Sequence, residues 1–212
     1  RRKMIAPQTI LDFYFDNNFR LVFWPQIGDH KGPHAEGWTT KAFTRADYRD
    51  GNRVGIMCGH ELSPGKFLHD VDIDWADGAQ IAQSLLPATD FMYGRAGKRI
   101  SHCWYTTSEA LPTFKYADPV DQGITYIELR GTKLDGTLGN QTMAPPSVWS
   151  KENAREPLEF VRMQLPTHIE EPSRLRQPVC LSALAMMFAR YFGKKGFGHE
   201  VRVAWAGFLL RA

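Results

Sequence analysis

The chain has 212 residues, of which 43% are apolar and 23% are charged, and its formal net charge at pH 7 is +3. This is an ordinary globular composition, large enough for one core with a smaller appendage. No apolar stretch reaches the length of a membrane span, and three widely spaced cysteines do not suit a disulfide scaffold, so we expect a reduced, cytoplasmic protein. The net charge alone is too small to indicate nucleic-acid binding.

The first third of the chain alternates short apolar runs with polar turns. The pattern predicts a helix over residues 9–19 capped by Thr9, a strand over 21–24, a loop over 25–36, a short helix within 38–50, a strand over 54–58, a turn over 61–65 and an acidic strand over 66–74.

The rest of the chain mixes strands and helices without regular alternation. We expect a helix from Ala79 that ends at Pro87, strands over 91–94, 101–106, 125–130, 141–144 and 158–163, a hairpin loop over 131–140, and helices over 179–192 and 200–211 joined by a glycine-rich loop. The fold class predicted is α+β. The composition turns polar and proline-bearing around 165–178, so we expect a main domain of residues 1–165, followed over 166–212 by a linker and the beginning of a helical accessory domain. Both ends of the sequence look cut, so we expect this second domain to be truncated.

The most informative stretch is the acidic strand, where an acid stands at every second position: Asp70, Asp72 and Asp74. Alternate residues of a strand share a face, so these acids are expected on one side, while Leu68, Val71 and Ile73 help to build the core. Three neighbouring like charges repel one another, and a divalent cation is the usual means of offsetting such repulsion.

Other readings of this acidic strand are weaker. An EF-hand loop also begins D-x-D-x-D, but it needs Gly where this chain has Trp75 and a bidentate acid where it has Ile81. An alternative explanation is that one or two of these acids simply face solvent on an edge strand. A hard-cation site needs acids from more than one strand, and Glu128, alone in the apolar run 126–130, is the natural third carboxylate.

A second cluster combines a histidine with basic residues. His102 lies in a strand-like run after a glycine-containing turn that carries Arg95, Lys98 and Arg99, a combination that suits phosphate binding. A buried core histidine and a solvated basic turn are the alternatives. The spacing of cysteines and histidines does not resemble a zinc site.

Three segments in this order resemble the bifunctional primase–polymerase (prim-pol) family of the archaeo-eukaryotic primase superfamily. They are Val71-Asp72-Ile73-Asp74, then Ser101-His102 after the basic turn, then Glu128 and Arg130 followed by Pro145-Pro146-Ser147. The similarity covers roughly residues 20 to 165. It implies a catalytic core related to the RNA-recognition motif and a DNA primase and polymerase of phage, plasmid or prokaryotic origin.

The resemblance also implies roles for individual residues. Asp72, Asp74 and Glu128 would hold two divalent ions, Mg²⁺ or Mn²⁺, while Asp70 is an additional acid without an assigned role. His102 would contact the phosphates of an incoming NTP or dNTP, and the other nucleotide-binding candidates are Arg95, Lys98, Arg99, Ser101 and Arg130. The implied partners are single-stranded DNA template and a helicase domain or protein, with no membrane.

Two departures from the family pattern concern template contacts. The insert over 131–140 is longer than a tight turn, and Trp149 stands where a histidine is frequent. Neither departure concerns the metal-binding acids. Acids gathered on strands also suit two alternative functions: a two-metal nuclease and a catalytically inactive nucleic-acid-binding module.

Overall fold

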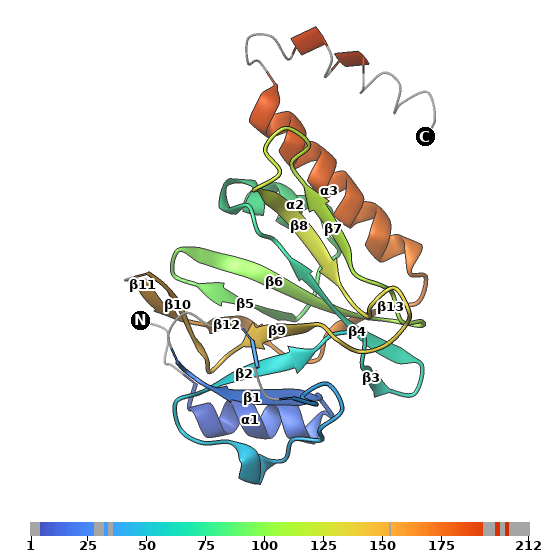
Figure 1. Ribbon diagram of the computed structural model, residues 1–212. Helices are drawn as coiled ribbons and strands as arrows, with labels where there is room; N and C mark the ends of the chain where they lie inside the picture. Colours follow the sequence, from blue (N-terminus) through green and yellow to red (C-terminus); the bar gives the residue numbers. More distant parts are fainter. Residues whose placement is uncertain are drawn as a thin grey trace.

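The computed structural model describes residues 5–27, 32–33, 36–152, 154–192, 198–199 and 202–203, and it has an α+β fold (Figure 1). The expected loop over 193–198 and helix over 200–211 lie largely outside the described residues. In chain order the elements are α1 (Pro7–Asp16), β1 (Leu21–Pro25), η1 (Arg45–Asp47), β2 (Asn52–Met57), β3 (Glu61–Ser63), β4 (Lys66–Asp72), η2 (Ala76–Gly78), α2 (Ala79–Leu85), β5 (Phe91–Arg95), β6 (Lys98–Thr107), β7 (Phe114–Ala117), β8 (Thr125–Arg130), β9 (Gln141–Ala144), β10 (Val148–Lys151), β11 (Ala154–Pro157), β12 (Glu159–Met163), β13 (Thr167–Ile169) and α3 (Ser173–Tyr191).

The strands form one large sheet and two small ones. The large sheet has the order β12-β5-β6-β4-β8-β7; in addition β3 pairs with β4, and β13 runs parallel to β6. A three-stranded sheet has the order β1-β2-β9, and β10 with β11 forms a separate hairpin. β4 therefore lies at the centre of the large sheet, between β6 and β8.

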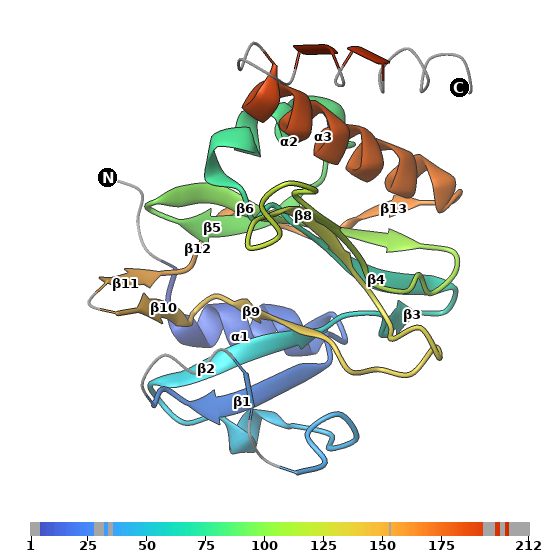
Figure 2. The same ribbon diagram turned by 45° about the horizontal axis from the view of Figure 1, so that its top comes forward.

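The two faces of the large sheet bury different cores. On one face, Val71 and Ile73 pack with Leu129 and with residues of α2 and α3. On the other face, Leu68 and Trp104 pack with α1 and with β1 and β2. Figure 2 shows this layering, with α2 and α3 on one side of the large sheet and α1, β1 and β2 on the other.

This layering corrects one prediction about the acidic strand. Leu68 lies on the same face as Asp70 and Asp72 because all three are separated by even numbers of residues. That face is therefore apolar at the beginning of β4 and acidic at its end. The strand ends at Asp72, so Asp74 follows it rather than belonging to it.

Two predicted helices differ from those observed. α1 begins at Pro7 and has no side-chain cap, so Thr9 lies inside the helix. Proline suits the first turn because the N–H it lacks has no intrahelical partner there. The helix expected within 38–50 is only the short 3₁₀ turn η1, closed by a capping box between Thr44 and Asp47.

The segment 131–140 does not form a hairpin loop, because the strands on either side of it belong to different sheets. β8 pairs with β4 and β7, whereas β9 pairs with β2. The loop thus carries the chain from the large sheet to the small one. The sequence pattern did not predict the strands β7, β10, β11 and β13, and it predicted a turn where β3 lies.

The segment beyond residue 165 packs on the main sheet as far as Tyr191. β13 extends the sheet beside β6, and Leu175 and Val179 of α3 enter the same core as Val71. At the end of α3, the Tyr191 hydroxyl donates to the buried Asp118 carboxylate at 2.7 Å. β13 and α3 therefore share a core with the central strand β4. Among the described residues, no helix combines the length and the apolar character needed to cross a membrane.

Candidate metal centre

Three carboxylates meet at the end of the central strand. Asp72 of β4 pairs in register with Glu128 of β8, and opposite residues of neighbouring strands present their side chains on the same face. Asp74 follows two residues later, and its backbone N–H donates to the Tyr126 carbonyl at 3.0 Å. One ligand oxygen from each carboxylate lies within 4.8 Å of the other two. The proximity expected from the sequence is therefore present.

Arg130 fixes two of these carboxylates. Its guanidinium contacts Asp72 Oδ2 at 2.7 Å and donates to Glu128 Oε2 at 2.8 Å. Burial would lower the pKa of Arg130, but the carboxylates of Asp72, Asp70 and Glu128 outweigh it and raise the pKa well above its usual value. Arg130 thereby links Asp72 of β4 to Glu128 of β8 beside the cluster.

Asp74 is in a different electrostatic position. Its side chain is exposed, and among the described residues none forms an ion pair with it. Burial of its surroundings and the charge of Asp72 both raise the pKa of Asp74, and Lys98 only partly opposes them. In the metal-free protein, the negative charge of Asp74 is therefore unfavourable.

Lys98 and His102 border the carboxylates. Lys98 Nζ donates to the Ile73 carbonyl at 2.6 Å and lies 3.4 Å from the Asp74 carbonyl. His102 pairs in register with Asp72 across β4 and β6, and its Nδ1 is 3.7 Å from Asp72 Oδ1. Burial would lower the pKa of His102, but Asp70 and Asp72 together raise it above its ordinary value, which favours the imidazolium.

Asp70 lies deeper than the other acids. It is fully buried, and its Oδ2 is 2.9 Å from His102 Nδ1 and accepts from Thr142 Oγ1 at 2.8 Å. It is not one of the three grouped ligands. The extra acid of the sequence pattern is therefore a buried hydrogen-bond acceptor beneath the carboxylate cluster.

The remaining basic residues separate into two positions. Arg95 borders the cleft, where its guanidinium forms an ion pair with Glu156 and lies 3.9 Å from the centre of the Trp149 ring. Arg99 is exposed and lines a different depression, beside Glu159 and Phe160. The structure thus brings Arg95 and Lys98 to the carboxylates but does not bring Arg99 there.

These groups line a polar cleft of about 630 Å³. Its lining residues are Asp72, Asp74, Arg95, Lys98, Ser101, His102, Glu128, Arg130, Asn140, Gln141, Thr142, Met143, Trp149, Lys151 and Leu158. Sequence reasoning missed the contribution of residues 140–143, which come from β9 and the loop before it. Their position directly before Pro145-Pro146-Ser147 was the only signal available.

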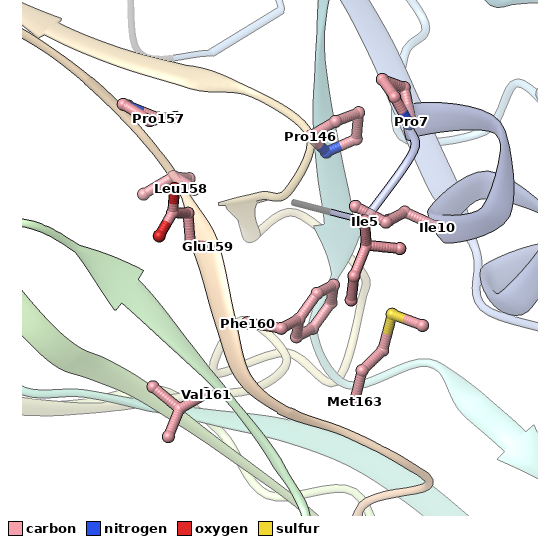
Figure 3. Close-up of a pocket in the computed structure, with 10 residues that line it drawn as sticks. All are labelled: Ile5, Pro7, Ile10, Pro146, Pro157, Leu158, Glu159, Phe160, Val161 and Met163. Atoms are coloured by element: carbon pink, nitrogen blue, oxygen red, sulfur yellow. The ribbon is translucent and has the colours of Figure 1, made fainter. Parts of the chain in front are cut away.

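A second cavity of about 440 Å³ has a different character (Figure 3). Figure 3 shows the side chains of Ile5, Ile10, Phe160 and Met163 gathered between α1 and β12. Among the described residues that line it, Glu159 is the one with a charged side chain. The clustered carboxylates belong to the polar cleft instead.

The donor set of the polar cleft fits a hard divalent cation. Its three clustered ligands are all carboxylates, the oxygen donors that Mg²⁺ and Mn²⁺ prefer. Arg130 pairs with Asp72 and Glu128, whereas no described residue forms an ion pair with Asp74, the third ligand. Comparisons with protein-family models, curated proteins and solved structures give no match for this chain.

Proposed function

We propose that this protein is a template-directed nucleotidyl transferase, a DNA primase and polymerase of the prim-pol type, with single-stranded DNA as template and NTP or dNTP as substrate. The observation that carries the proposal is the grouping of Asp72, Asp74 and Glu128 from neighbouring strands, with the ligand oxygens within 4.8 Å of one another. The ordered sequence motifs supply the same three acids and the adjacent histidine.

The fold is compatible with this proposal at the level of the central sheet. Two of the carboxylates lie on adjacent antiparallel strands, β4 and β8, and the face opposite them is covered by α2 and α3. We propose that this arrangement is the core related to the RNA-recognition motif that the family resemblance implies.

The carboxylates would hold the two divalent ions, Mg²⁺ or Mn²⁺. When bound, such ions lower the pKa of an attacking hydroxyl and neutralise charge on a triphosphate. Arg130 keeps Asp72 and Glu128 in fixed positions, and these two carboxylates together with that of Asp74 would supply the ligand oxygens.

Cations beside the carboxylates would bind the substrate's phosphates. Lys98, His102 and Arg95 line the same cleft as the acids. Cations fixed in advance near phosphates stabilise the charge that develops on the leaving pyrophosphate. The 3′-hydroxyl of a primer would attack the α-phosphate directly, so no covalent enzyme intermediate is required.

A primer-extension assay tests the proposal. The protein is incubated with single-stranded template, primer, labelled nucleotides and Mn²⁺ or Mg²⁺, and we expect products that lengthen with time. The variant Asp72→Asn should lose synthesis by at least a hundredfold while binding template normally, and Asp50→Asn, an exposed acid outside the cleft, should keep full activity.

The other outcomes are equally informative. Cleavage of the template without nucleotide addition would identify a two-metal nuclease instead. Template binding with neither activity would identify an inactive binding module. Full synthesis by Asp72→Asn would refute the assignment of the carboxylates.

A further inference from the structure

The polar groups of the cleft converge on one buried side chain. The Asp70 carboxylate is fully buried, and it pairs in register with Arg130 on one side and Trp104 on the other. Its Oδ2 contacts both His102 Nδ1 and Thr142 Oγ1. Both contacts are made to Oδ2, whereas Oδ1 is buried without a hydrogen-bond partner among the described residues. A buried carboxylate is costly to leave without partners, so losing either contact at Oδ2 would raise that cost further.

The first partner is His102. Asp70 Oδ2 accepts from Thr142, and as an acceptor it favours a proton on Nδ1 of the neutral His102 imidazole. Nε2 is then the ring nitrogen left to meet a ligand, and no described residue provides a partner for it. The same type of contact orients metal-binding and catalytic histidines in general.

The second partner leads to the metal ligands. Thr142 Oγ1, which donates to Asp70, accepts from Arg130 at 3.2 Å. Arg130 in turn holds Asp72 at 2.7 Å and Glu128 at 2.8 Å. Thr142 comes from β9 of the small sheet, so this chain of contacts also joins the two sheets at the cleft.

We propose that Asp70 is a positioning residue: it fixes the ring of His102 with Nδ1 protonated and Nε2 toward the cleft, and it anchors Arg130 through Thr142. Asp70 binds neither metal nor substrate in this scheme. This role of Asp70 rests on the proposed function where nucleotide binding is measured, whereas the tautomer of His102 can be measured independently of it.

The tautomer of His102 tests the first half without any activity measurement. Long-range ¹H–¹⁵N spectra are recorded at increasing alkaline pH until the His102 signals no longer change, and these signals are assigned by their absence in His102→Gln. We expect the Nδ1–H form in the unaltered protein, although free histidine favours Nε2–H. In Asp70→Asn, whose amide can donate to Nδ1, the Nε2–H form should grow. An Nε2–H tautomer in the unaltered protein would overturn the proposal, and this result needs no variant of Asp70 to fold.

Binding measurements test the consequence. Free Mn²⁺ binding, followed by electron paramagnetic resonance, should change less than threefold in Asp70→Asn because the three ligands remain. Binding of dATP and ATP in the presence of Mn²⁺ should weaken about tenfold, the lower end of the effect of removing an outer partner. The control Thr142→Val should keep the Nδ1–H tautomer of His102, since the contact between His102 and Asp70 does not involve Thr142.

The two possible failures can be told apart. If the unaltered protein binds no nucleotide with Mn²⁺, the proposed function fails, and the tautomer experiment still decides the role of Asp70. If the unaltered protein binds nucleotide and Asp70→Asn binds it equally well with an unchanged tautomer, the positioning role is refuted.

Discussion

Replacing Asp74 by asparagine should stabilise the metal-free protein and weaken its response to metal. The Asp74 carboxylate lies within 4.8 Å of the Asp72 and Glu128 ligand atoms, and no described residue pairs with it. At that distance two unit charges repel by about 1 kcal/mol in water and by about 3.5 kcal/mol at an effective dielectric constant of 20. Because the Asp74 side chain is exposed, the lower value applies.

The sign follows from the direction of the pKa shift. Burial and the charge of Asp72 raise the pKa of Asp74, so its ionisation costs stability at every pH above the folded-state pKa. The neutral amide removes that cost. We therefore expect the free energy of unfolding in EDTA to rise by about 1 kcal/mol, which for a chain of this size corresponds to about 2–4 °C in melting temperature.

Metal reverses the order of the two proteins. At a Mn²⁺ concentration one hundred times its dissociation constant, binding stabilises the unaltered protein by about 2.7 kcal/mol. Asp74→Asn has lost one anionic ligand and should gain much less. Thermal denaturation is measured for both proteins in EDTA and in Mn²⁺.

The exposed acid Asp50 provides the control, because it lies outside the carboxylate cluster. Asp50→Asn should leave both the metal-free stability and the Mn²⁺ response nearly unchanged. The reasoning is refuted if Asp74→Asn lowers the stability in EDTA, or if Mn²⁺ stabilises Asp74→Asn as much as the unaltered protein.

Three further predictions concern the fold. Burial lowers the pKa of His69 to about 4 from an ordinary value of 6.5, so the unfolded chain binds a proton at a higher pH than the folded protein does. The free energy of unfolding should therefore fall by about 3 kcal/mol between pH 6.5 and pH 4. Denaturant titrations should find a smaller fall in His69→Gln. Tyr191→Phe, which removes a donor from the buried Asp118, should cost about 1–2 kcal/mol in the same assay, and an unchanged value would show that α3 does not depend on this contact. Gly59 and Gly65 both have positive φ, but a Cβ at Gly59 would lie 2.5 Å from Thr132, whereas one at Gly65 would meet no atom within 4 Å. Gly59→Ala should therefore lower the melting temperature more than Gly65→Ala, and equal melting temperatures would contradict this.

Much of the central sheet could be predicted because the signal was local. The alternation in β4 and the apolar run around Glu128 define two strands and the faces of their acids from the pattern of neighbouring residues alone. We predicted that these two strands are neighbours because a shared metal site needs their acids close together. The register that sets Asp72 against Glu128 confirms that they lie side by side.

The parts that sequence reasoning missed depend on contacts between distant segments. The pairing of β9 with β2 brings Thr142 to Asp70 across 72 positions of the chain, and nothing near Thr142 indicates that partner. The role of Asp70 was open for the same reason. Short strands such as β13 take their structure from the sheet edge that receives them rather than from their own propensity.

The most direct test is a crystal structure of the protein with Mn²⁺ and a nucleoside triphosphate, with anomalous scattering data to locate the metal. The account predicts manganese peaks bonded at roughly 2 Å to oxygens of Asp72, Asp74 and Glu128. It also predicts the triphosphate beside Lys98 and His102. A nucleotide bound elsewhere, or a cluster without manganese at saturating concentration, would contradict it.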